Sequence, residues 1–324
     1  MRLLVLPAVL FSTMVAGFPT SDYQKENTTD YDIELDQIRK HIVKLKDDAF
    51  IHPVEVDPAR SLIHLLYRQA SLTMSYSDVE VAKTAIDNAN EAPRSKLRGI
   101  TELNSEDFSE GEANPVASYG ECQVQQSDAS EEFYILKAVL DFKFHQLPSM
   151  KSNLKLVTAL ADSLQVKTLK ADLALQEGRY GDVKSEYEDI IAKKRTWDNL
   201  ARLAYLKSKF GDVFGANNLY LEAQAQMTAK EMRSFSWLEL QTGLLDFSRG
   251  RHKEALAHYQ RANKAYSGYW LVEAHIAEVF GSLGRFDEAV ALYERLINRT
   301  AKPELQQALG DLYLFMGKPL QAKS

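Results

Sequence analysis

The chain of 324 residues repeats itself over its C-terminal half, and this internal repeat limits the fold more than any other feature. Glycines recur there at successive spacings of 33, 39, 34 and 33 residues. These glycines are Gly178, Gly211, Gly250, Gly284 and Gly317. A small or β-branched residue stands five positions after each of the first four, and a tyrosine stands nine positions after. A period near 34 residues with fixed anchors indicates a stack of similar small units.

Each unit is predicted to be two antiparallel helices joined by a tight turn at the glycine, which can end a helix in the left-handed conformation without a Cβ clash. Seven positions before each glycine stands another small residue, expected where the two helices cross, because a larger side chain would force their axes apart. The tyrosines are expected to pack against the next unit. The small residues are Ala171, Ala204, Gly243, Ala277 and Gly310, and the tyrosines are Tyr187, Tyr220, Tyr259 and Tyr293.

With these anchors, residues 178–322 resemble an array of tetratricopeptide (TPR) repeats. The chain as a whole, which residues 1–17 lead us to expect to be exported as set out below, is similar to secreted or periplasmic TPR proteins of bacteria. The resemblance implies an all-α fold in which helix-turn-helix units stack into a right-handed superhelix, an α-solenoid. The array is predicted to cover residues 164–324 with about five repeats, the last of them incomplete. An insertion around residues 226–233 should lengthen a helix or a loop, and His252 stands where the family usually has an aromatic residue.

The last repeat has its turn at Gly317, but few residues follow before Ser324. Such arrays normally end in a polar capping helix, so an apolar face is expected to lack cover. Three explanations remain open: a longer natural array, a partner or a second copy that covers the end, or a frayed terminal helix.

Residues 1–17 have the layout of a secretory signal peptide. One positive charge at Arg2 precedes an apolar run that ends near Val15, and the small residues Ala16 and Gly17 follow. The run is shorter than the roughly 20 residues of a membrane-spanning helix. We therefore expect export with cleavage near Gly17 and no stable membrane span afterwards, with a retained anchor as the alternative. The destination would be the periplasm in a Gram-negative bacterium, and the protein would otherwise be secreted.

Residues 18–103 are predicted to be a helical N-terminal region, in which any repeats are degenerate. Helices are expected over residues 31–45, from the N-cap pair Asp57-Pro58, and over residues 78–89. Residues 104–132 contain many Asp and Glu but no Lys or Arg, which predicts an acidic linker or long loop. A calcium-binding loop is the alternative, although no D-x-D-x-D-G pattern supports it. Residues 133–163 are predicted to form a helical lead-in to the array.

The family resemblance implies a concave groove along the first helices of the repeats. Counting back from each glycine, the groove positions predicted to bind a partner are Asp172, Asp198, Tyr205, Trp237, Leu240, Leu244, Glu278, Gln307 and Asp311. This mixed apolar and acidic set suggests an extended or helical peptide segment with basic residues as the partner. The alternative is that these residues only form the ordinary face of a solenoid. Trp197 and Trp270 are expected to pack between repeats instead.

No sequence motif indicates an enzyme, a cofactor or a metal site. The densest cluster is His252, Glu254 and His258, but the two histidines are six residues apart and so lie on opposite sides of a helix. The lone Cys122 is expected to be a free thiol, with an intermolecular disulfide as the alternative. A formal net charge of −6 argues against nucleic acid as a partner.

The leading prediction is therefore a non-catalytic scaffold that binds a protein or peptide. Two other functions remain open. One is a ligand-binding or enzymatic N-terminal region with the repeats as an accessory. The other is a homo-oligomer that assembles through the uncapped C-terminal repeat.

Overall fold

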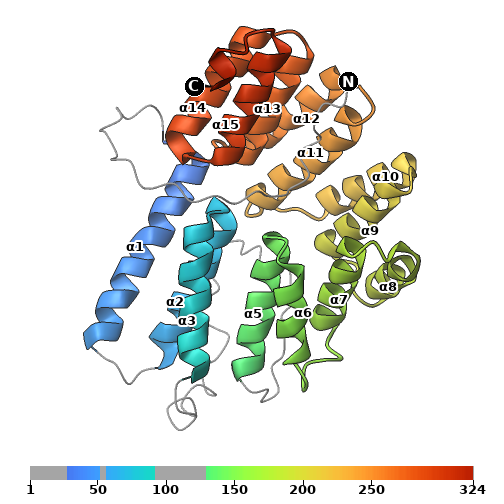
Figure 1. Ribbon diagram of the computed structural model, residues 1–324. Coiled ribbons are helices and arrows are strands. Elements are labelled where there is room, and N and C mark those ends of the chain that lie inside the picture. The colour runs from blue at the N-terminus through green and yellow to red at the C-terminus, as the bar shows by residue number, and fades with distance from the viewer. Residues whose placement is uncertain (1–27, 52–55, 92–128, 324) are drawn as a thin grey trace. The chain divides into compact units, whose positions relative to one another are not determined.

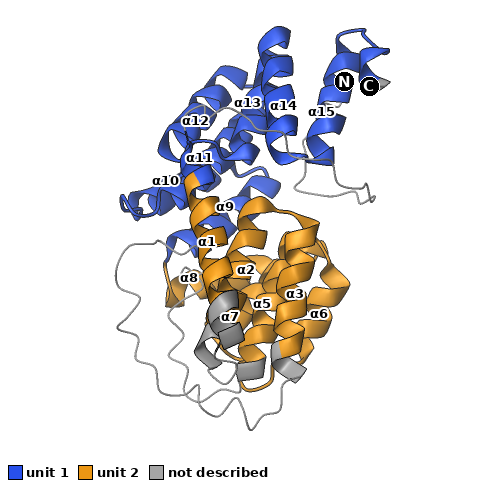
Figure 2. Cartoon of the chain, turned by 90° about the vertical axis from the view of Figure 1, so that its left-hand side faces the viewer, with its two compact units in different colours: residues 1–32, 196–324 blue, residues 33–195 orange. Residues whose placement is uncertain are grey.

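A computed structural model describes residues 28–51, 56–91 and 129–323, and these residues form α-helices, one short 3-10 helix and no strand (Figure 1). The predicted all-α fold is confirmed. The expected signal peptide, most of the acidic loop and Cys122 lie outside the described residues. The chain divides into two compact units, one of residues 1–32 and 196–324 and the other of residues 33–195 (Figure 2).

The unit of residues 33–195 contains most of α1 (Asp30–Ile51) and three pairs of helices in which neighbours along the chain pack together. The pairs are α2 (Val56–Thr73) with α3 (Tyr76–Glu91), α5 (Ala129–Lys143) with α6 (Leu147–Lys155), and α7 (Leu164–Gln176) with α8 (Tyr180–Lys193). The helical N-terminal region is thus confirmed, although α2 begins one residue before the expected N-cap.

The core of this unit combines small side chains with buried carboxylates that have polar partners. Ala70 of α2 and Val79 of α3 are fully buried, which lets these two helices approach closely. Asp141 of α5 is also fully buried, and it forms an ion pair with Lys83. Its Oδ2 accepts hydrogen bonds from Asn153 Nδ2 at 2.7 Å and from the hydroxyl of Ser149 at 2.7 Å. The buried carboxylate therefore has the partners that a buried charge requires.

The start of α5 differs from the predicted acidic loop. The helix begins at Ala129, so Glu131 and Glu132 lie in its first turn. The buried Glu131 carboxylate accepts hydrogen bonds from the backbone N–H groups of Thr158, Ala159 and Leu160 at 3.0, 2.9 and 2.9 Å, and from the Thr158 hydroxyl at 2.8 Å. Composition alone placed these glutamates in solvent because it does not show that a distant turn supplies the donors.

The second unit consists of consecutive helix pairs followed by a last single helix. The helices are α9 (Trp197–Lys209), α10 (Val213–Ala225), α11 (Met232–Phe247), α12 (His252–Ala265), α13 (Trp270–Ser282), α14 (Phe286–Thr300), α15 (Pro303–Phe315) and the 3-10 helix η2 (Gln321–Lys323). The repeat glycines adopt left-handed φ angles between +72° and +80°, which confirms the predicted turns.

Small residues and tyrosines take the predicted places within the pairs. Ala204 and Ala216 are fully buried in the α9–α10 pair. In the next pair, a Cβ built on Gly243 would lie 2.3 Å from Cε1 of Tyr259, so glycine is needed for α11 and α12 to pack. The ring of Tyr259 also lies 5.6 Å from that of His275 in α13. Tyr259 therefore packs both within its own pair and against the next one.

The insertion around residues 226–233 lengthens both a loop and a helix, as predicted. A loop runs between α10 and α11, and α11 has 16 residues where α9 and α13 have 13. After Gly317, the described residues form only the short helix η2, and the side chains of Leu314, Phe315 and Leu320 are exposed.

Candidate partner-binding site

The predicted groove residues of the second unit lie on its first helices, which are neighbours. The rings of Trp197 in α9 and Trp237 in α11 meet edge to face at 6.4 Å. Helices α11 and α13 are in contact, and a Cβ built on Gly281 of α13 would lie 3.1 Å from Leu312 of α15. Side chains on these helices can therefore form one continuous row.

Part of the predicted set is accessible on this row. The half-buried members are Tyr205 of α9 and both Trp237 and Leu244 of α11. Gln307 and Asp311 of α15 are exposed. We refer to these five residues as the accessible row. They combine two aromatic rings and an aliphatic side chain with an amide and a carboxylate.

Three of the predicted binding residues, Leu240, Asp172 and Asp198, are buried and leave little surface for a partner. Leu240 of α11 is only 1% exposed, and Asp172 of α7 is 2% exposed and belongs to the other unit. Asp198 of α9 is also buried, and one of its oxygens accepts a hydrogen bond from Arg202 at 3.0 Å. Counting back from the glycine finds the correct helix, but it does not distinguish the groove from the crossing between the two helices.

Some repeats have a carboxylate six positions before the turn glycine, and it lies near the tyrosine that stands nine positions after the same glycine. Asp172 accepts a hydrogen bond from the hydroxyl of Tyr187 at 2.6 Å. Burial, together with the negative charges of Glu278 and Asp311, raises the pKa of Tyr293. Glu278 is mostly buried and lies 2.9 Å from Nδ1 of His275. These carboxylates thus help to fix the interior of the repeats, and only Asp311 is fully accessible.

The other two tryptophans have the packing surroundings that the sequence predicted. Trp270 is buried, and the ammonium of Lys302 lies 4.1 Å from its ring centroid. Trp197 contacts Trp237, as described above. Trp237 therefore packs on its neighbouring repeat and still keeps part of its ring exposed.

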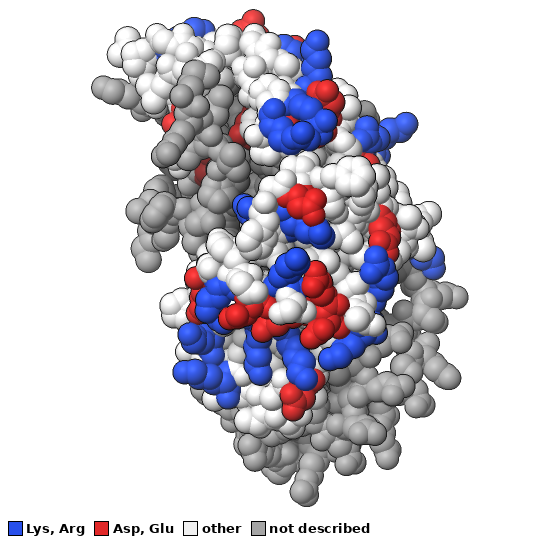
Figure 3. Space-filling model, turned by 90° about the vertical axis from the view of Figure 1, so that its right-hand side faces the viewer, with Lys and Arg blue, Asp and Glu red and all other residues white. Residues whose placement is uncertain are grey.

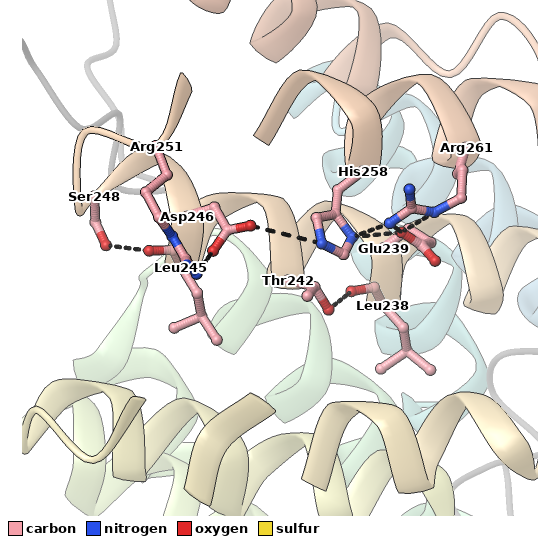
Figure 4. Close-up of polar contacts among 9 residues, drawn as sticks. All are labelled: Leu238, Glu239, Thr242, Leu245, Asp246, Ser248, Arg251, His258 and Arg261. Atoms are coloured by element: carbon pink, nitrogen blue, oxygen red, sulfur yellow. Dashed lines mark hydrogen bonds and ion pairs between the residues drawn. The ribbon is translucent and has the colours of Figure 1, made fainter. Parts of the chain in front are cut away.

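A polar cluster between α11 and α12 was missed by the sequence reasoning (Figure 4). Nδ1 of His258 lies 2.7 Å from Oε2 of Glu239, and its Nε2 lies 3.7 Å from Oδ2 of Asp246. Arg261 donates to the same oxygen of Glu239 at 3.2 Å, and Arg251 forms an ion pair with Asp246. The available signal was the pair of acidic residues seven positions apart on one face of α11.

The charged side chains of this cluster form ion pairs with one another. Burial raises the pKa of Glu239, but hydrogen bonds from His258 and Arg261 outweigh that effect and lower it. His258 thus finds its partners on α11 and not beside His252, whose ring packs on Phe247 at 5.1 Å. No group of His, Cys, Asp and Glu within the described residues could hold a metal ion. The arrangement is suited to joining two helices.

On the face drawn in Figure 3, acidic and basic side chains are interspersed among the described residues, without a broad basic area. None of the described helices combines the length and the apolar character needed to cross a membrane.

Comparisons with known proteins agree with this architecture. The family model for the tetratricopeptide repeat matches residues 246–312. No curated protein matches the sequence. Among solved structures, the Cut9–Hcn1 hetero-tetramer of the APC/C is similar over 89% of this chain and 50% of that one, with 12% identity and a TM-score of 0.51.

Two bacterial structures are also similar to parts of this chain. A tetratricopeptide repeat protein from Parabacteroides merdae has 19% identity and a TM-score of 0.42, covering 60% of this chain and 77% of that one. The pilF protein of Pseudomonas aeruginosa has 14% identity and a TM-score of 0.46, covering 60% and 88%. At these identities the likeness concerns the fold alone. Together with the glycine turns and the buried crossings, the family match shows that this chain contains tetratricopeptide repeats, matched over residues 246–312.

Proposed function

We propose that this chain is a non-catalytic scaffold that binds a peptide or protein segment along the first helices of its repeats. Tetratricopeptide repeats are typical of such scaffolds, because stacked helices present an extended surface. The observation that carries the proposal is the accessible row, in which Tyr205, Trp237 and Leu244 come from adjacent helices. Aromatic side chains that are partly exposed and rigidly supported are the usual anchors of an interface.

The row also suggests the chemistry of the partner. Its apolar part lies on α9 and α11, whereas Gln307 and Asp311 supply polar groups on α15. A segment with apolar side chains at one end and a basic side chain at the other would satisfy both parts. Export from the cytoplasm is part of the same proposal and rests on the sequence of residues 1–17.

The proposal is tested by affinity capture with the full chain as bait, followed by binding measurements on the captured protein. Replacing Tyr205 and Trp237 together by alanine should weaken binding at least about tenfold, since anchors of this kind contribute upwards of 2 kcal/mol. Phe214→Ala is the matched control, because Phe214 is a 78% exposed aromatic residue of α10 and lies outside the row.

Trp237 also packs on Trp197, so the unfolding midpoint of each variant must be measured beside its affinity. Loss of binding in a variant that still unfolds cooperatively supports the proposal. Equal binding by the double variant and the wild-type chain, or an equal loss with Phe214→Ala, would show that the partner binds elsewhere.

A further inference from the structure

The loop between α12 and α13 binds a segment from the other end of the sequence. The amide N–H of Ser267 donates to Oδ2 of Asp30 at 2.8 Å, and its hydroxyl donates to the same oxygen at 2.7 Å. The Ser267 hydroxyl also accepts from the backbone N–H of Asp30 at 3.0 Å, and its carbonyl accepts from the N–H of Tyr31 at 3.1 Å. The amide N–H, the hydroxyl and the carbonyl of Ser267 thus all form hydrogen bonds with Asp30 or Tyr31, which stand 237 and 236 positions earlier in the sequence.

The glycine of this loop, Gly268, leaves room for the same segment. Gly268 has a φ of +76°, and a Cβ built on it would lie 2.2 Å from the Oγ1 atom of Thr29. By contrast, a Cβ on Gly284, which has the same φ of +76°, would meet nothing within 4 Å. Gly268 therefore does more than permit a left-handed turn, because it also leaves space for Thr29.

An aromatic contact completes the docking. The buried ring of Tyr31 stacks on that of Tyr269, with centroids 6.4 Å apart and an angle of 19° between the planes. The guanidinium of Arg299 lies 5.9 Å from the Tyr31 centroid and donates to the carbonyl of Gly268 at 2.7 Å. The loop thus recognises an acidic residue by hydrogen bonds and the following aromatic residue by stacking.

The bound segment is preorganised. The Thr29 hydroxyl donates to Oδ2 of Asp32 at 2.6 Å, and the N–H of Asp32 donates back to Oγ1 of Thr29 at 3.2 Å. The backbone N–H of Thr29 also donates to Oδ2 of Asp32 at 3.4 Å, and together with the bond from the N–H of Asp32 this makes a capping box at the start of α1. It fixes the backbone that carries Asp30 and Tyr31, which lowers the entropic cost of docking them.

From these contacts we propose that the α12–α13 loop is a recognition site for a short segment in which a hydroxyl residue, an acidic residue and an aromatic residue follow one another. Residues 29–31 of the chain occupy this site as an internal ligand. A segment of the same chemistry from a second copy of this chain binds there when the internal one is absent. This site is separate from the accessible row, so it does not depend on the proposed function.

The internal contact is tested by hydrogen exchange on the full chain. Gly268→Ala should speed exchange at the amides of Ser267 and Tyr31 at least about tenfold, because the new Cβ displaces Thr29. The matched control is Gly284→Ala, which introduces the same left-handed strain but meets no neighbour. Unchanged exchange in Gly268→Ala, or an equal increase at these amides in both variants, would overturn the internal ligand.

The recognition site itself is tested with a labelled peptide of residues 28–43. It should bind the full chain carrying Asp30→Ala and Tyr31→Ala at least about tenfold more tightly than the wild-type chain, whose internal segment competes at an effective concentration in the millimolar range. Adding Gly268→Ala to that double variant should abolish the binding. Equal affinity for the double variant and the wild type, or binding that survives Gly268→Ala, would refute a recognition site.

Discussion

Single atoms decide how closely the two helices of a repeat approach. Gly243 lies against the edge of the Tyr259 ring, and that ring is fully buried, with His275 nearby in the next pair. A ring held on both sides cannot easily move away from an added methyl group. The repeat therefore depends on the absence of a single carbon atom at this position.

Gly243→Ala should destabilise the chain by about 1–3 kcal/mol through overpacking. Gly181→Ala is the control, because Gly181 is an exposed residue in helix α8 and a Cβ on it would meet nothing within 4 Å. The control should instead leave the stability unchanged or raise it slightly, since alanine is the better helix former and Gly181 lies in the first turn of α8. Urea unfolding followed by circular dichroism measures both. A Gly243→Ala variant as stable as Gly181→Ala would contradict the packing argument.

The repeat tyrosines are equivalent in sequence but not in hydrogen bonding. The hydroxyl of Tyr187 donates to the buried Asp172, whereas that of Tyr259 has no hydrogen-bond partner among the described residues. Tyr187→Phe should therefore cost about 1–2 kcal/mol, because a buried carboxylate loses a donor. Tyr259→Phe should leave stability unchanged or raise it. The two unfolding free energies give the comparison, and an equal loss in both variants would show that the hydrogen bond to Asp172 contributes nothing.

At the scale of helices, the sequence predicted the elements that repeat and missed the contacts that occur once. The glycine period located each turn, since only a few residue types tolerate a left-handed φ. The pairing of Glu131 with a distant turn has no local pattern, and the two acidic residues on one face of α11 do not show which side chains of α12 pair with them. The same limit explains why Leu240 was assigned to the groove, because the boundary between groove and core depends on how two helices cross.

The contact of Glu131 with residues 158–160 should make the unit of residues 33–195 sensitive to acid. Burial raises the pKa of Glu131, but hydrogen bonds from Ala159, Leu160 and Thr158 outweigh it and lower the pKa from 4.5 to about 2. A pKa that is lower in the folded state stabilises the fold above pH 4.5, and this stabilisation is lost as the pH falls toward 2.

Glu131→Gln should therefore lower the urea midpoint at neutral pH, and its difference from the wild type should shrink as the pH falls below 4.5. Glu132→Gln is the control, since it removes a charge from the same helix turn without breaking the contacts to residues 158–160. Glu132 also lies 3.7 Å from Nε2 of His64, so an equal pH profile in the two variants would show that the loss of a charge from this turn, and not the hydrogen bonds to residues 158–160, accounts for the effect.

At the scale of the whole molecule, the sequence predicted an all-α chain of stacked pairs, and the described residues have that architecture. It did not predict that residues 29–31 bind the α12–α13 loop. Their polar and aromatic side chains form no repeat and no periodic face, so only the folded chain shows their partner. Contacts between segments this distant are specified by three-dimensional complementarity, which a search for periodicity does not detect.

The proposed export predicts where the entire chain is found and at which residue the mature protein begins. If residues 1–17 direct secretion, the mature protein should begin near Phe18 and leave the cytoplasm, which fractionation and N-terminal mass spectrometry would show. Leu10→Arg places a charge within the apolar run and should keep the full-length chain inside the cell. Leu156→Arg is the control, because it adds the same charge at an exposed leucine of the folded part. Recovery of the wild-type chain from the cytoplasm with Met1 intact would refute export, whereas the internal ligand and the accessible row would be unaffected, since both depend only on residues after position 28.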